Sequence, residues 1–112
     1  MKSKRIKLQV NVPVSHVDAV RIALGNAGAG KIGEYSHCAF VSSGTGYFCG
    51  SSSSNPSIGS KGVLEAVAEC KLEMVMNSED LRVVMEALKI SHPYEEIPVE
   101  LFSLLDPQEC LS

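Results

Sequence analysis

Apolar and polar residues alternate near the start of the chain. Between residues 6 and 12, every second position is apolar: Ile6, Leu8, Val10 and Val12. Successive side chains of a β-strand point to opposite faces, so this period predicts a strand with one face in water.

A helical period follows the first strand. Its apolar positions are three or four residues apart: Val17, Val20, Leu24 and Ala27. Ser15 and Asp18 have the spacing of a capping box, which predicts that the helix begins there. Glycine readily takes the left-handed conformation that ends helices, so we expect the helix to end among Gly25, Gly28 and Gly30.

Residues that favour strands return at Tyr35. The stretch from Tyr35 to Val41 predicts a second strand. The small residues from Ser42 to Gly46 predict a turn into Tyr47-Phe48-Cys49, and therefore a short hairpin. The stretch from Gly50 to Gly62 is rich in Ser and Gly, which predicts a surface loop.

The longest alternation runs from residue 64 to residue 76. Its apolar members occupy every second position: Leu64, Ala66, Ala68, Cys70, Leu72, Met74 and Met76. Ala and Glu would also allow a helix over 63 to 69, but the period of two continues to Met76 and favours one long strand. Such a strand would overhang a small sheet and require a partner, so we expect self-association.

A second helix and a last strand complete the pattern. Ser78 is predicted to cap the helix, whose buried face comprises Leu81, Val84, Met85 and Leu88. Pro93 ends this helix near Ser91, and Pro98 cannot donate to a sheet ladder. We therefore expect the segment 92–98 to be a rigid connection at a sheet edge, followed by a strand through Val99 and Leu101. Residues 106–112 are expected to form a frayed tail.

The predicted order is strand, helix, strand, strand, helix, strand. It is the order of a ferredoxin-like β-α-β-β-α-β sandwich, an α+β fold whose antiparallel sheet carries two helices on one face. The 112 residues suit a single domain spanning 1–112.

Charge and composition narrow the possible partners. The formal net charge is -3, and the basic cluster Lys2, Lys4, Arg5 and Lys7 lies at a terminus, so we do not expect a nucleic-acid partner. No apolar run approaches the ~18 residues that span a bilayer, and no signal peptide is expected, which favours a cytoplasmic protein without a membrane partner. The four cysteines show no C-x-x-C spacing, so we expect free thiols, two of them packed as small hydrophobic residues.

A glycine motif at residues 28–33 matches G-x-G-x-x-G, and residues 25–31 match most of a Walker A pattern. A nucleotide motif must leave a strand and open a helix, whereas these glycines leave a helix and open a strand. Ile32 also stands where the Walker pattern needs Ser or Thr. The context favours a tight helix-to-strand turn.

The segment 92–98 carries the best candidate chemistry. His92 with Glu95 or Glu96 could share a divalent cation or a proton across the proline turn. The favoured alternative is that His92 and Tyr94 bond the backbone while the glutamates are solvated charges. A nucleophile elbow, an H-E-x-x-H motif and a dense carboxylate cluster are all missing, so catalysis is poorly supported.

Five short motifs follow one another along nearly the whole chain. In order they are Gly28-x-Gly30-x-Ile32-Gly33-x-Tyr35-x-x-Cys38-x-Phe40, Gly44-x-Gly46-x-Phe48, Pro56-x-Ile58-Gly59, Glu69-x-Lys71-x-Glu73 and His92-Pro93-Tyr94-Glu95-Glu96-x-Pro98. Together they resemble the YqfO-type module, which occurs as an insert in Nif-three-like dinuclear-metal proteins and as a short free-standing protein.

The resemblance has implications for fold and assembly. The module is similar in fold to PII signalling proteins and CutA proteins, which implies a ferredoxin-like subunit that assembles as a trimer through sheet edges. The dinuclear metal ligands of the larger family lie in flanking domains, so hydrolase-like chemistry does not transfer to this module. The Ser51–Ser54 run departs from the loop of full-length relatives, which puts any shared loop function in doubt.

We therefore expect a non-enzymatic binding or regulatory module, oligomeric and most simply trimeric, that holds a small ligand or a divalent cation. The expected ligand-binding residues come from the glycine turn and the segment 92–98: Gly30, Gly33, Tyr35, His92 and Tyr94. The expected metal ligands are His92, Glu95 and Glu96. One alternative is a metal-dependent hydrolase or metal-handling protein using the same segment. Another is a protein-interaction domain whose Gly50–Gly62 loop docks a partner.

Overall fold

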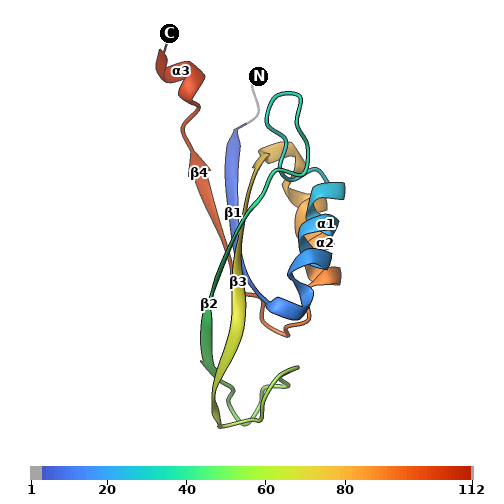
Figure 1. The fold of residues 1–112 in the computed structure, drawn as a ribbon, viewed down its shortest axis with the longest axis vertical. Coiled ribbons are helices and arrows are strands. Elements are labelled where there is room, and N and C mark those ends of the chain that lie inside the picture. Colours follow the sequence, from blue (N-terminus) through green and yellow to red (C-terminus); the bar gives the residue numbers. More distant parts are fainter. Residues whose placement is uncertain (1–3, 112) are drawn as a thin grey trace.

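The structure is a computed structural model that describes residues 4–111. It is a two-layer sandwich with α1 and α2 on one face of a four-stranded antiparallel sheet (Figure 1). The strands and helices are β1 (Arg5–Pro13), α1 (Val17–Asn26), β2 (Phe40–Cys49), β3 (Leu64–Asn77), α2 (Leu81–Ser91), β4 (Val99–Leu104) and α3 (Pro107–Leu111). Short 3-10 turns, η1 (Val14–His16) and η2 (Ser78–Asp80), precede α1 and α2. The strand order is β2-β3-β1-β4, and the predicted ferredoxin-like α+β fold is confirmed.

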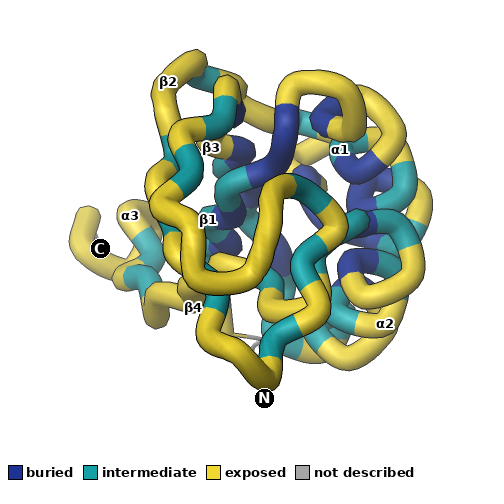
Figure 2. The backbone as a smooth tube through the Cα atoms, turned by 90° about the horizontal axis from the view of Figure 1, so that it is seen from below, coloured by how far each residue is buried: buried dark blue, intermediate teal, exposed yellow. Residues whose placement is uncertain are grey.

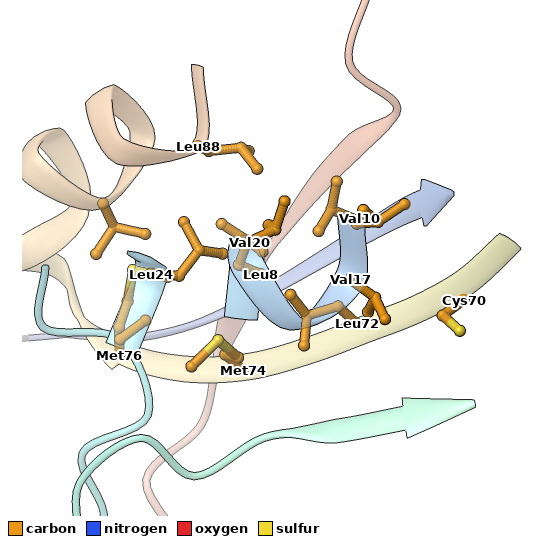
Figure 3. Close-up of a cluster of buried hydrophobic side chains, with 13 residues drawn as sticks. Leu8, Val10, Val17, Val20, Leu24, Cys70, Leu72, Met74, Met76 and Leu88 are labelled. Carbon is orange, nitrogen blue, oxygen red and sulfur yellow. The ribbon is translucent and has the colours of Figure 1, made fainter. Parts of the chain in front are cut away.

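The core lies between the two central strands and the two helices. The alternating apolar residues of β1 and β3 point towards the helices and are buried, as Figure 3 shows for Leu8, Val10, Leu72, Met74 and Met76. The buried positions gather between the layers in Figure 2. Each fully buried Val, Leu or Met contributes about 1.5–3 kcal/mol, so this cluster is the main source of stability.

The predicted long strand is confirmed, and it overhangs the helices. β3 pairs with β1 from Glu69 to Asn77, whereas its first five residues pair only with β2. Leu64 and Ala66 lie on the same face as the buried core residues but are exposed. In Figure 1, β2 and β3 extend together below the helices as a two-stranded ribbon.

The predicted hairpin at residues 42–46 is wrong. β2 is one continuous strand that begins at Phe40, and Ser42 to Gly46 lie inside it. Tyr35 belongs to the preceding turn, where it forms an isolated bridge with Ile32. Gly46 serves packing rather than turning, because a Cβ atom at this position would collide with the side chain of Glu69.

Both predicted helix caps are also wrong. The Ser15 hydroxyl bonds Nδ1 of His16, and the Ser78 hydroxyl accepts from the backbone N–H of Lys4, so neither caps a helix. The 3-10 turns provide the entry to each helix instead. The predicted frayed tail contains the short exposed helix α3.

The glycine motif follows α1, as predicted, and forms a turn in which the three glycines of the motif have positive φ. Gly30 has a φ of 85°, and a Cβ atom there would collide with the backbone of Cys38. This close approach requires glycine. The four cysteines are free thiols, but Cys70 alone is buried, so the expected second buried cysteine is absent.

Candidate functional site

His92 follows α2 and begins the segment 92–98, which leads to β4. It has extended backbone dihedrals (φ -81°, ψ 134°), as the following proline requires. Its Nε2–H donates to the carbonyl oxygen of Asn11 at 2.8 Å, and its Nδ1 accepts from the backbone N–H of Tyr94 at 3.1 Å. Burial lowers the pKa of His92, which favours the neutral ring that this pair of bonds requires.

Tyr94 connects the segment 92–98 to β3 through its hydroxyl. Its hydroxyl donates to Oε2 of Glu69 at 2.6 Å, and its ring centroid lies 6.1 Å from that of Phe48 and 4.9 Å from that of His92. Burial, together with the hydrogen bond to Glu69, raises the pKa of the Tyr94 phenol. The hydroxyl therefore stays protonated and acts as a donor at neutral pH.

Glu69 is the acceptor of this bond and is only 7% exposed. The Tyr94 hydroxyl is its one hydrogen-bond donor among residues 4–111, and no cation of that range forms an ion pair with it. The alternation of β3 places Glu69 on the sheet face opposite the helices, next to Gly46 of β2. The absent side chain of Gly46 leaves the space that the carboxylate occupies.

A cavity of about 360 Å³ surrounds the Glu69–Tyr94 pair. Phe48 and Glu69 line it from β2 and β3, Tyr94 and Glu96 from the segment 92–98, and Ile58 from the loop between β2 and β3. Its size lies near the lower end of the range for small-molecule sites, and its lining mixes aromatic and apolar groups with a few polar ones, as such sites do.

The loop that borders the cavity is tied to the segment 92–98. The Glu95 carboxylate accepts from the backbone N–H of Asn55, with the shorter of the two contacts at 2.9 Å. The loop from residue 50 to residue 62 therefore borders the cavity on one side. Its backbone lies at the lower end of the β2–β3 ribbon in Figure 1.

The predicted ligand-binding residues fall into two separate groups. His92 and Tyr94 lie together near the end of β1, where Asn11 holds the imidazole. The turn containing Gly30 and Gly33 lies at the start of β1, where Arg5 donates to the carbonyl oxygen of Lys31 at 2.8 Å. The six residue steps from Arg5 to Asn11 span about 20 Å along the strand. Tyr35 is 75% exposed beside this turn, so the glycine turn and His92 do not share one site.

The predicted metal ligands are not assembled as a set. Both ring nitrogens of His92 are engaged in hydrogen bonds, and the Glu95 carboxylate is bonded to the loop. Within residues 4–111, no three His, Cys, Asp or Glu side chains gather as a metal site would require. The residues present do not fit a metal centre in this arrangement.

Sequence reasoning missed Glu69 and Phe48 as members of the site. The available signal was Gly46, a glycine within a strand, which often marks a close approach of another group.

Within the described residues, no helix is both long and apolar enough to span a membrane.

Comparisons with known proteins identify long relatives. No family model matches the chain. It is 48% identical over 105 residues to a GTP cyclohydrolase 1 type 2 homolog of Halalkalibacterium halodurans, with 94% of this chain and 28% of the relative covered. A Bacillus subtilis protein of the same name is 49% identical over 96 residues, with 86% and 26% covered. The chain thus spans about a quarter of the length of these curated relatives.

Solved structures similar to this chain include a relative of the same family and two proteins that share only the fold. A Bacillus cereus protein related to NIF3 superposes with a TM-score of 0.82 at 40% identity, over 95% of this chain and 27% of that one. The periplasmic divalent cation tolerance protein CutA of Archaeoglobus fulgidus gives 0.65 at 14% identity, covering 91% and 85%. A Bacillus subtilis GlnK–ATP complex gives 0.62 at 12% identity, covering 93% and 84%. At these lower identities, CutA and GlnK show the fold alone. The chain therefore carries the YqfO-type module of the NIF3-related proteins, in a fold shared with CutA and GlnK.

Proposed function

We propose that this chain is a non-enzymatic binding or regulatory module whose ligand site is the cavity around Glu69 and Tyr94. The observation that carries the proposal is the buried Glu69 carboxylate on the wall of a cavity of about 360 Å³, with the Tyr94 hydroxyl as its one donor among the described residues. Buried polar side chains with few partners beside an apolar cavity are the usual means of orienting a small ligand.

The hydrogen-bonding state of the site supports binding over catalysis. The raised pKa of Tyr94 keeps its hydroxyl protonated at neutral pH, so it is not poised as a base. His92 uses both ring nitrogens to hold Asn11 and the backbone of Tyr94. These two side chains therefore shape the site rather than exchange protons with a bound molecule.

The hydrogen bond from the backbone N–H of Asn55 to the Glu95 carboxylate supports a regulatory role. A ligand that enters the cavity contacts both the segment 92–98 and the loop that Glu95 holds. Binding would therefore change the position or the order of the loop, which is exposed to partners. Loops positioned by a rigid scaffold commonly carry such functions.

A fragment screen by protein NMR tests the site. We expect hits to shift the backbone amide resonances of Gly46, Phe48 and Tyr94. A Tyr94→Ala variant should lose these hits, whereas Tyr35→Ala, which removes a tyrosine that is 75% exposed and lies outside the cavity lining, should keep most of them. Hits that map elsewhere, or that survive Tyr94→Ala unchanged, would contradict the proposed site.

We further propose that the module self-associates as a trimer through its sheet. β2 is an edge strand of ten residues, and the sheet face opposite α1 and α2 is exposed beyond the cavity that the segment 92–98 and the loop 50–62 border. Phe40 and Phe102 lie on that face and are 65% and 42% exposed. Exposed edges and apolar faces of this kind favour pairing with another chain. Light scattering should give three times the chain mass; a monomer at high concentration would refute the assembly.

A further inference from the structure

The lining of the proposed binding cavity has one sign of charge. It includes three glutamates, Glu69, Glu95 and Glu96, and among the described residues it contains no lysine, arginine or histidine. We infer that the cavity selects an organic cation, an ammonium or guanidinium group carried on an apolar body. This inference rests on the proposed function and names the ligand class of the same site.

Glu69 supplies the main argument for a positive group. Removing a carboxylate from water is costly unless a countercharge or several donors compensate it. Within residues 4–111, Glu69 has the Tyr94 hydroxyl as its one donor; its Oε1 accepts no hydrogen bond and is not fully buried, so it remains open to a group in the cavity. An ammonium or guanidinium group in the cavity would donate a hydrogen bond to Oε1 of Glu69 and would place a positive charge beside the carboxylate.

The aromatic rings provide a second, independent reason. Phe48 and Tyr94 both line the cavity, and their rings are tilted by 56° with centroids 6.1 Å apart. The faces of aromatic rings attract cations, by about 0.5–2 kcal/mol in measured cases. Pro56, Ile58 and Pro98 complete an apolar wall against which the uncharged body of the ligand packs.

The same lining disfavours phosphates and carboxylates. Sites for these anions use arginine, lysine or converging backbone N–H groups, whereas here three carboxylates would repel the ligand. Lys71, two residues beyond Glu69 on β3, is exposed and does not line the cavity. The cavity therefore differs in charge from a nucleotide site.

Three probes of matched shape and different charge test the inference: 2-phenylethylamine, 2-phenylethanol and 3-phenylpropionate. Each is titrated into the full chain while the amide resonances of Gly46 and Phe48 are followed by NMR. We expect the amine to bind at least tenfold more tightly than the alcohol or the anion. Glu69→Gln should weaken amine binding at least tenfold, whereas Glu73→Gln, on the same strand and face but outside the cavity, should not.

The outcomes separate the inference from the proposed function. Equal binding of the alcohol or the anion, or an unchanged affinity in Glu69→Gln, would overturn the cation assignment and leave the binding site standing. If none of the probes shifts the cavity amides, both fail. Tighter binding of Zn²⁺ that displaces the amine would also overturn the assignment. Glu69→Gln keeps an oxygen to accept from Tyr94; if it still fails to fold, Glu96→Gln at the exposed rim replaces it, with the same expected direction.

Discussion

The Tyr94→Phe substitution removes one hydroxyl from the wall of the cavity and leaves the ring in place. The contacts of that ring with Phe48 and His92 do not involve the hydroxyl, so they should persist. Glu69, however, loses its one hydrogen-bond donor within residues 4–111 while remaining buried. The substitution therefore isolates the contribution of a single bond to a carboxylate.

The expected cost follows from the charge and the burial of the acceptor. A hydrogen bond to a charged group contributes about 1.5–3 kcal/mol, and a buried acceptor without a donor bears its full desolvation penalty. We expect Tyr94→Phe to lower the free energy of unfolding by about 2 kcal/mol, below the upper limit because Tyr94 is only partly buried. For a domain of this size the melting temperature would fall by roughly 8 °C.

Urea unfolding followed by circular dichroism measures this loss. The control is Tyr47→Phe, in which the removed hydroxyl belongs to an exposed residue, and its effect should stay within about 0.5 kcal/mol. If the two variants were equally stable, the bond between Tyr94 and Glu69 would contribute nothing and the reasoning would be refuted.

The pH dependence gives a second test of the same bond. Folding raises the pKa of Tyr94, so its contribution to stability is complete below the pKa of an unfolded tyrosine, about 10, and is lost as the pH rises above it. Above pH 10 the stability difference between the native chain and Tyr94→Phe should therefore shrink. A difference that grows with pH would contradict the raised pKa.

Three further predictions concern other contacts. The pKa of His92 is lowered by burial, so its imidazole resonances should titrate below pH 6.5, and the stability associated with the neutral ring should decline as the pH falls below that value; titration above 6.5 would refute this. Gly30→Ala should lower the free energy of unfolding, measured in urea, by roughly 2–5 kcal/mol, because both the positive φ and the close approach of the Cys38 backbone oppose a Cβ atom. Gly33→Ala, which has a positive φ but open space around it, should lower it by only about 1–2 kcal/mol. Glu95→Ala should speed hydrogen exchange at the amide of Asn55, and unchanged exchange would show that the loop is held by other contacts.

The strands and helices whose apolar residues recur at a regular spacing could be predicted from the sequence. β3 alternates over its whole length, and α1 and α2 carry helical apolar stripes, so burial on one side fixed their type. The hairpin predicted within β2 is wrong because glycines inside a strand have the same local composition as glycines in a turn. Gly46 is instead required by a side chain of the neighbouring strand, and local composition carries no information about that contact.

The site was only partly predictable for the same reason. Tyr94 could be predicted as a site residue because it lies between two prolines, Pro93 and Pro98, in a segment rich in polar groups. Glu69 resembles Lys71 and Glu73 in the pattern, since all three occupy the polar side of β3. Only Glu69 is buried, and its partner Tyr94 is 25 residues away, so the distinction arises from tertiary packing that a period cannot show.

The overhanging ribbon formed by β2 and β3 makes the molecule long. Its principal extents are 53 × 24 × 24 Å and its radius of gyration is 15.6 Å, compared with about 13 Å for a compact chain of 112 residues. A particle of this shape experiences more friction than a sphere of equal mass, so it should sediment slowly and elute early from a sizing column. A calibrated column would therefore overstate the mass of the monomer, whereas scattered light intensity reports that mass independently of shape.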